Sequence, residues 1–296
     1  MKVAVTGGTG FVGRPLVSAL QAQGHEVCLL TRHPERVSAP MSARHFDALA
    51  QNPNGLLDGI DAVVHLSGEP VIGRFTSGHR ARVLESRVNG TRAIAAAAVA
   101  SQSVRTLVSA SGVGYYGARG AEWLSETAAP GNDFLAQVCV AWEGASETAE
   151  RAGIRTVRLR IGAALHPDGG KLRAILPVFR LGLGGPLGSG EQYVSWIHRD
   201  DFVALVLHAL QQSHVHGAYN AVAPAPLTDR DFARTLGHVL RRPTFLKVPS
   251  LALRLALGEL ADVVLAGQRC SAEKVMQSGF VHRYAALDTA LRAFTL

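Results

Sequence analysis

A glycine-rich segment near residue 10 has the spacing of a phosphate-binding loop. The segment Gly7-Gly8-Thr9-Gly10-Phe11-Val12-Gly13 follows a short apolar run, Val3 to Thr6. Glycines at these positions let the chain turn sharply, let the backbone approach a diphosphate, and let the next helix pack closely on the strand. Backbone N–H groups and the dipole at the start of that helix attract phosphate oxygens. The segment therefore predicts a dinucleotide site formed by Gly7, Thr9, Gly10, Phe11, Val12 and Gly13.

The end of the second apolar run indicates which dinucleotide is bound. NAD enzymes usually place a carboxylate there to hold the ribose 2′-hydroxyl. Here the run Val27 to Leu30 continues into Thr31 and Arg32, and Glu26 lies at the opposite end. A guanidinium suits a 2′-phosphate, because it forms charge-assisted hydrogen bonds with phosphate oxygens. We therefore expect NADP(H) rather than NAD(H), with Thr31 and Arg32 in contact with it; the alternative is that Arg32 is an ordinary exposed arginine.

Serine and tyrosine side chains gather after another apolar run, Thr106 to Ser109. Ser111, Tyr115 and Tyr116 lie in the segment that follows it, at the edge where doubly wound sheets bind ligands. A tyrosine with an ordinary pKa of about 10 is ionised in only about one molecule in a thousand at pH 7, so proton transfer needs assistance. We take these three residues as catalytic candidates; the tyrosines could instead form the wall of the substrate pocket or fill the core.

Further polar and aromatic residues are candidates for substrate contact. A histidine titrates near neutral pH, but His198 could equally have a structural hydrogen-bonding role, and Glu69 could simply fix a loop. The glycine-rich loop Gly184 to Gln192 offers backbone N–H groups to anionic oxygens. The substrate candidates are Glu69, Arg160, Gln192, Trp196 and His198. Because the histidines and cysteines lack ligand-type spacing, we expect no catalytic metal.

The elements that must position these residues alternate between strand-like and helix-like runs. Helices are expected over Phe11 to Gln23, Arg82 to Ala100, Phe134 to Ala152 and Asp200 to Gln212, with short apolar strands between the first three and before the fourth. This alternation predicts an α/β fold with a doubly wound parallel sheet, the Rossmann arrangement.

The second half of the chain is less regular. Residues 162–196 are glycine-rich, which predicts loops, and the sequence after Pro224 predicts a smaller helical lobe that includes an amphipathic helix over Leu251 to Leu265. We expect a dinucleotide-binding Rossmann domain and a smaller carboxy-terminal substrate lobe. Their predicted bounds are 1–162 plus 197–222 for the first and 163–196 plus 223–296 for the second.

Composition narrows the class of protein. The chain has 296 residues, of which 47% are hydrophobic and 18% charged, a globular rather than disordered composition. The net charge of +7 comes from scattered arginines without any long basic run. We therefore expect a small anionic ligand and not a nucleic acid. The longest uncharged apolar run, Ile94 to Ala100, is too short for a bilayer, and glycines from Gly7 onward interrupt any leader-like run. We expect a cytoplasmic protein without membrane contact.

Several segments together resemble the extended short-chain dehydrogenase/reductases, and more narrowly their atypical branch called the epimerase family, which is similar to sugar-nucleotide epimerase-like proteins. The resemblance covers essentially the whole chain, with two departures: Phe75 stands where the branch usually has tryptophan, and Ser271 where it usually has proline. It implies cofactor contacts from Leu66, Ser67 and Gly68, a nucleotide-sugar-like substrate, and a possible homodimer formed through the Arg82 to Ala100 helix. The segments that carry it are the glycine loop, His65 to Val71, Ser86-Arg87, Thr91-Arg92, Ser109 to Gly117, Ser195 to Asp201, Asn220 to Pro224 and Gly279-Phe280.

The resemblance breaks at the catalytic residues. The family usually combines a Ser or Thr with Tyr-x-x-x-Lys on one helix, and this chain has no lysine between Lys2 and Lys171. Aligning Glu143 with the family's glutamate puts Leu135 and Cys139 at the two positions. The resemblance thus implies an NADP(H)-dependent oxidoreductase or epimerase with another proton-transfer group, acting on a small alcohol or carbonyl compound. The alternative is an NADP(H)-binding sensor or regulatory protein without conventional turnover, and a nucleic-acid-associated protein is the least favoured reading.

Overall fold

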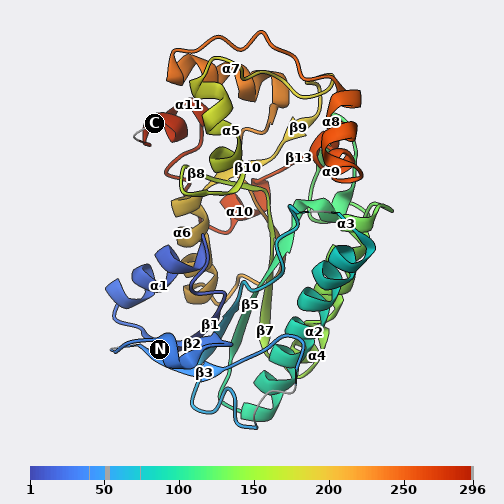
Figure 1. Cartoon of the computed structure of the whole chain (residues 1–296). Coiled ribbons are helices and arrows are strands. Elements are labelled where there is room, and N and C mark those ends of the chain that lie inside the picture. Colours follow the sequence, from blue (N-terminus) through green and yellow to red (C-terminus); the bar gives the residue numbers. More distant parts are fainter. Residues whose placement is uncertain (40, 51–53, 74, 295–296) are drawn as a thin grey trace. The chain divides into compact units, whose positions relative to one another are not determined.

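The computed structural model describes residues 1–39, 41–50, 54–73 and 75–294 (Figure 1). A central sheet of seven strands has the order β11-β7-β5-β4-β1-β2-β3. The register is parallel for every pair from β5 through β4, β1 and β2 to β3. This confirms the predicted α/β doubly wound sheet. The strands are β1 (Lys2–Thr6), β2 (Glu26–Thr31), β3 (Ser42–His45), β4 (Ala62–His65), β5 (Thr106–Gly112), β7 (Arg155–Ile161) and β11 (Gly217–Ala221).

The strand order reverses between β1 and β4, which is where such sheets bind ligands. In the register, Thr6 lies opposite His65, and His65 lies opposite Ser109. β1 and β4 therefore end at the same level at the carboxyl edge of the sheet, and β5 continues past that level to Gly112. The glycine loop follows β1, Leu66 to Gly68 follow β4, and Ser111 lies at the end of β5.

Helices connect the strands and cover the sheet (Figure 1). They are α1 (Gly13–Ala22), α2 (Ser77–Ser101), α3 (Phe134–Gly144), α4 (Glu147–Arg151) and α6 (Arg199–Gln211), with a 3₁₀ turn η1 (Pro34–Arg36) after β2. Ile94, Ala95 and Ala98 of α2 are fully or almost fully buried and share a core cluster with Leu107 of β5. These small side chains let α2 pack closely. Whether α2 pairs across a dimer stays a prediction.

One half-buried arginine, Arg155, fastens the end of α6 to the sheet. Nη1 of Arg155, at the start of β7, donates to the carbonyl oxygens of Ala209 at 2.7 Å and Val215 at 2.8 Å. Nη2 donates to the Leu210 carbonyl at 2.9 Å and to the Thr106 hydroxyl at 3.1 Å. The last carbonyls of a helix lack hydrogen-bond donors within the helix. Arg155 supplies donors for two of them, those of Ala209 and Leu210. Burial lowers the pKa of Arg155 below its usual value.

The remaining elements are mostly short. They are η2 (Val113–Tyr116), β6 (Trp123–Leu124), β8 (Ala163–His166), α5 (Gly170–Arg180), β9 (Tyr193–Val194), β10 (Trp196–His198), β12 (Leu227–Thr228), α7 (Asp229–Leu240), α8 (Ser250–Leu257), α9 (Leu260–Leu265), β13 (Arg269–Cys270), α10 (Glu273–Gln277) and α11 (Leu287–Arg292). A core cluster that includes Leu176, Trp196, Phe232 and Leu236 joins α5, β10 and α7.

Three expected elements differ in detail from the structure. The helix expected over Phe134 to Ala152 is divided into α3 and α4, and the helix expected over Leu251 to Leu265 is divided into α8 and α9. Gly258, at φ 59°, ends α8 in the left-handed region, which a continuous helix does not permit. The region expected to be loops contains α5, whose buried residues Leu172, Leu176 and Phe179 follow a helical period.

The chain divides into two compact units. The first comprises residues 1–111, 138–159 and 203–219, and the second comprises 112–137, 160–202 and 220–296. Within the described ranges, no helix combines the length and apolar character that a bilayer crossing needs.

Candidate functional site

The glycine loop in the first unit is built for close backbone approach. Gly7 has φ 68°, and a Cβ on it would lie 3.1 Å from the backbone of Leu66 and Ser67. A Cβ on Gly13 would lie 2.0 Å from the Gly7 carbonyl oxygen, so only glycine fits there. A Cβ on Gly10 would meet the Gly7 carbonyl oxygen alone, at 3.1 Å, so its other sides are open to a ligand. The helix that follows, α1, begins at Gly13, and the residue before it, Val12, forms no side-chain cap. The first N–H groups of α1 suit a diphosphate.

Thr6 links this loop to the end of β4. Its hydroxyl oxygen accepts hydrogen bonds from the N–H groups of Leu66 at 3.0 Å and Ser67 at 3.1 Å. The same hydroxyl lies 2.8 Å from Nδ1 of His65, which is fully buried. Burial lowers the pKa of His65 to about 4. The predicted cofactor segments around Gly7 and around Leu66 are therefore held together by one hydroxyl group.

Thr31 ends β2, and Arg32 follows it as an exposed residue. The Thr31 hydroxyl accepts a hydrogen bond from the His33 N–H at 3.2 Å, which fixes the turn after the strand. Glu26, at the other end of β2, pairs with Lys2 at 2.6 Å. In the described part of the chain, Arg32 has no carboxylate partner, so its guanidinium is available to an anionic ligand.

Glu69 and its neighbours are fixed by α2. The Glu69 N–H donates to the Ser86 hydroxyl at 3.0 Å, and the Glu69 carbonyl accepts from Arg87 Nη1 at 2.8 Å. The Arg87 guanidinium also lies 5.0 Å from the ring centroid of Trp142, and burial lowers its pKa. The Glu69 carboxylate is partly exposed and lies 3.7 Å from Arg82. The loop-fixing role considered for Glu69 thus belongs to its backbone, and its side chain is available to solvent or ligand.

Ser111, buried at the end of β5, donates a hydrogen bond from its hydroxyl to Glu143 Oε1 at 2.7 Å. Glu143 lies on α3, one turn after Cys139, which is itself buried. With its proton engaged, the Ser111 oxygen can still accept a hydrogen bond from a ligand. The sequence had drawn attention to Glu143 only as an alignment marker, and no local signal indicated this contact.

Tyr116 belongs to a buried polar network of the second unit. Its hydroxyl donates to Asn220 Oδ1 at 2.7 Å and accepts from Arg160 Nη1 at 2.9 Å. Asn220 in turn donates to the carbonyls of Leu124 and Ser271 at 3.0 and 3.1 Å. Burial raises the pKa of Tyr116 well above its usual value, although the nearby Arg160 opposes the shift. These contacts give Tyr116, Arg160 and Asn220 a structural function, and the sequence had assigned no role to Asn220.

Tyr115 occupies a different environment from its neighbour. It is partly exposed, and the Arg160 guanidinium carbon lies 3.5 Å from its ring centroid. The two tyrosine rings meet edge to face with centroids 5.3 Å apart. The Tyr115 hydroxyl makes no hydrogen bond with any residue in the described ranges. Of the two tyrosines, only Tyr115 therefore has a hydroxyl that is open to another group.

Trp196 and His198, both on β10, are buried in the second unit. The Trp196 indole N–H donates to the Ala225 carbonyl at 3.0 Å. The His198 ring stacks on Tyr284, with centroids 3.8 Å apart, and on Phe294 at 4.7 Å. Burial lowers the pKa of His198, so the neutral form is favoured. Both side chains are buried in the core of the second unit. This packing does not support the substrate contacts that the sequence predicted for them.

The glycine-rich loop before β9 is held by polar contacts within the second unit. Gln192 Nε2 donates to the Leu187 carbonyl at 2.9 Å, and the Gln192 carbonyl accepts from the Asp229 N–H at 2.8 Å. Asp229 Oδ2 accepts from the Leu187 N–H at 2.8 Å and its Oδ1 from Lys171 Nζ at 3.1 Å. Gln192 therefore shapes this loop. Across the described ranges, no group of three or more His, Cys, Asp or Glu side chains could hold a metal ion.

Comparison with known proteins agrees with the strand order and the glycine loop. Residues 3–221 match the model of the NAD dependent epimerase/dehydratase family. The chain belongs to this family. A second model, of a domain of unknown function (DUF1731), matches residues 248–294.

Relatives within the epimerase family match nearly the full length. The chain is 38% identical over 300 residues to the chloroplastic epimerase family protein SDR39U1 homolog of Arabidopsis thaliana, covering 99% of this chain and 86% of the relative. It is 39% identical over 293 residues to epimerase family protein Mb2239 of Mycobacterium bovis, covering 98% and 96%. The crystal structure of human SDR39U1 (isoform2) with NADPH superposes with a TM-score of 0.89 at 34% identity, covering 99% of this chain and 98% of that one. The predicted resemblance is therefore confirmed.

Proposed function

We propose that this epimerase family protein binds NADP(H) and acts as an oxidoreductase or epimerase on a small alcohol or carbonyl compound, with nucleotide-sugar-like compounds among the candidates. The observation that carries the proposal is the glycine cradle from Gly7 to Gly13, together with Arg32, which follows β2 and has no carboxylate partner among the described residues. The human relative named above was crystallised with NADPH, which agrees with the NADP(H) prediction. We further propose that the first unit binds the cofactor and the second the substrate.

The residues of the first unit suit distinct parts of the cofactor. Backbone N–H groups at the start of α1 would hold the diphosphate, and Arg32 would pair with the 2′-phosphate. Leu66 to Gly68, which Thr6 holds beside the loop, would line the nicotinamide half. NADP(H), when bound, supplies the hydride chemistry, and the protein provides orientation and proton management.

The proton requires a group of the protein. Tyr116 is unsuitable, because its hydroxyl is already engaged as donor and acceptor and its pKa is raised by burial. We assign the proton to the Tyr115 hydroxyl oxygen, which is free of hydrogen bonds in the described part of the chain. Ser111, whose own proton is held by Glu143, would accept a hydrogen bond from the substrate hydroxyl. The assignments of Glu69 and of Gly184 to Gln192 to substrate contact remain proposals.

A second candidate function has an observation in its favour. The α3 positions that carry the dyad in the family hold Leu135 and Cys139, and Cys139 is buried. A chain that binds the cofactor without this dyad could act as an NADP(H)-dependent sensor. In that case the bound cofactor would report the ratio of its two redox forms through contacts with another molecule.

Two measurements separate these functions. Titration of the purified chain with NADPH and NADH, followed by coenzyme fluorescence, should give tighter binding of NADPH. Incubation of the NADPH complex with a panel of aldehydes, ketones and nucleotide-sugars should then consume NADPH, or convert a sugar to its epimer, faster than buffer alone. Binding without either reaction favours the sensor, and failure of both coenzymes to bind rejects both proposals.

A further inference from the structure

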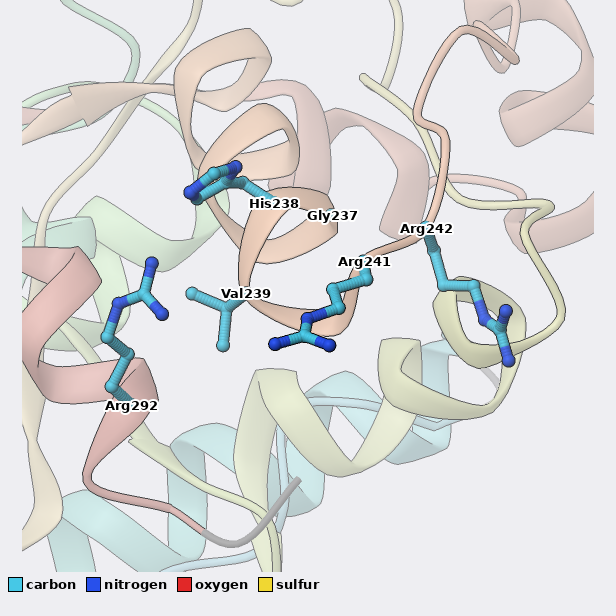
Figure 2. Close-up of a pocket in the computed structure, with 6 residues that line it drawn as sticks. All are labelled: Gly237, His238, Val239, Arg241, Arg242 and Arg292. Atoms are coloured by element: carbon cyan, nitrogen blue, oxygen red, sulfur yellow. The ribbon is translucent and has the colours of Figure 1, made fainter.

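A hollow at the end of α7, in the second unit, is lined by three arginines and a histidine among its six residues. Its volume is about 520 Å³, which is within the range of small-molecule sites. Figure 2 shows the guanidinium groups of Arg241 and Arg292 on either side of Val239, with Arg242 farther along the same chain segment. The lining residues are Gly237, His238, Val239, Arg241, Arg242 and Arg292.

We propose that this hollow is a second anion site, which binds a compact polyphosphate group. It shares no residue with the glycine cradle. The proposal goes beyond the function proposed above and does not depend on it.

The fold at the end of α7 places these side chains along one hollow. The Arg241 backbone N–H donates to the carbonyls of Gly237 and His238. The Arg242 backbone N–H donates to the Gly237 carbonyl at 2.8 Å. The chain then turns back over the helix so closely that a Cβ on Gly237 would lie 2.2 Å from the Thr244 side chain. Arg242 Nε donates to the Arg180 carbonyl at 2.8 Å, which ties the hollow to the end of α5.

The identity of residue 241 is unusual for its backbone conformation. Arg241 has φ 54° and ψ 43°, the left-handed conformation in which helices commonly end with glycine. A non-glycine side chain in this conformation carries a steric penalty. Backbone strain of this kind often accompanies a function of the side chain. Gln102, which ends α2, also has a left-handed conformation, so the conformation alone assigns no function. At residue 241 it sets a guanidinium at the edge of the hollow.

The positive charge in the hollow is only partly neutralised. Arg292 pairs with Asp288 through two contacts, at 2.6 and 3.1 Å. Arg241 and Arg242 form no ion pair with the residues that the structure describes. Cations at a helix C-terminus do complement the helix dipole. However, the backbone N–H groups of Arg241 and Arg242 already satisfy the carbonyls of Gly237 and His238, so these two carbonyls do not need the guanidinium groups.

The lining indicates the chemical class of the ligand. One guanidinium group can bind two phosphate oxygens at once through parallel hydrogen bonds. Several guanidinium groups around one hollow therefore suit a ligand with several phosphates better than a ligand with a single phosphate. The lining contains no phenylalanine, tyrosine or tryptophan on which a nucleobase could stack. A short chain of linked phosphates fits these features, either free or as the triphosphate of a nucleotide.

The test is calorimetric titration of the whole chain with tripolyphosphate, with ATP and with a short single-stranded oligonucleotide. The informative variant is Arg241→Gly, because glycine adopts the same backbone conformation without strain and removes the guanidinium. Arg292→Ala removes a second lining cation. Arg234→Ala, on the exposed side of the same helix, is the matched control for net charge, and Arg32→Ala is the control for the glycine cradle.

We expect tripolyphosphate to bind, with an affinity that falls about tenfold in each lining variant, since one charge-assisted hydrogen bond is lost. The two control variants should bind as the unaltered chain does. ATP binding with the same dependence on Arg241 would identify a nucleotide as the source of the phosphates, and equal binding of tripolyphosphate would identify the phosphates alone as sufficient.

Three results with tripolyphosphate would overturn the proposal. The first is unchanged binding by an Arg241→Gly variant that melts at or above the normal temperature, and the second is an equal loss of affinity in Arg234→Ala. The third is a loss of affinity in Arg32→Ala, which would place the ligand in the cradle. Binding of the oligonucleotide alone, with dependence on Arg241, would also reject a compact ligand.

Discussion

Replacing Arg32 by alanine tests the coenzyme assignment directly. Arg32 follows the last residue of β2 and is exposed. Glu26, whose carboxylate pairs with Lys2, begins the same six-residue strand and is therefore about 17–20 Å away along it. Arg32 has no carboxylate partner in the described ranges, so its removal leaves no charge of the protein unpaired. We expect the folded chain to be unaffected and the loss to fall on the ligand.

The size of the loss follows from this exposed setting. A hydrogen bond to a charged group contributes about 1.5–3 kcal/mol, and exposed ion pairs lie at the low end of such ranges. We therefore expect NADPH to bind about tenfold more weakly, which corresponds to about 1.4 kcal/mol. NADH has no 2′-phosphate, so its affinity should change by less than about twofold, the usual effect of a surface substitution.

Coenzyme fluorescence titrations at low and moderate ionic strength measure both affinities. The preference for NADPH should shrink as salt is added, because screening weakens exposed charge pairs. Arg32→Lys should retain part of the preference, and Arg36→Ala, a neighbouring exposed arginine in η1, should retain all of it. An equal loss of NADPH and NADH affinity in Arg32→Ala would refute the phosphate assignment.

Four further results are expected. Gly13→Ala should destabilise the fold by about 1–3 kcal/mol in urea unfolding and weaken NADPH binding, because its Cβ would lie 2.0 Å from a carbonyl oxygen. Gly144→Ala, where there is space for the methyl group, should have neither effect. Tyr115→Phe should abolish turnover without changing the melting temperature, and unchanged turnover would remove Tyr115 from the mechanism. Tyr116→Phe should instead lower the free energy of unfolding by about 1–3 kcal/mol while NADPH still binds; a fully stable variant would argue against its network. Burial lowers the pKa of His65 from its usual 6.5 to about 4 in the folded chain. The unfolded chain therefore binds more protons between these two values, and stability should fall as pH falls through that window, by up to about 3 kcal/mol. A His65→Gln variant should show a flatter pH profile, and an equally steep one would contradict this cause.

Local patterns in the sequence were sufficient to predict the cofactor half of the fold. Gly7 to Gly13 lies between a strand and a helix that are both close in the chain, so short-range rules apply. The apolar strands β1, β4 and β5 were recognised for the same reason. The helix α5 was not, because the glycines around it and Pro177 within it mask its period.

The environment of the tyrosines could not be predicted locally. Tyr116 is fixed by Arg160, 44 residues later, and by Asn220, 104 residues later. Two adjacent tyrosines thus look alike in sequence although only one has an available hydroxyl. The contact between Ser111 and Glu143 spans 32 residues and depends on how α3 packs. Such contacts follow from tertiary packing, which sequence spacing alone does not specify.

The position of Arg155 has a consequence for self-association. β11 is the outermost strand of its side of the sheet, and exposed edge strands are templates for pairing with other chains. The guanidinium of Arg155 binds the carbonyls of Ala209 and Leu210 at the end of α6 and that of Val215 in the segment that follows. Substituting this one side chain would loosen the segment that leads into the border strand. The position of the strand that another chain could pair with therefore depends on a contact made one strand further into the sheet.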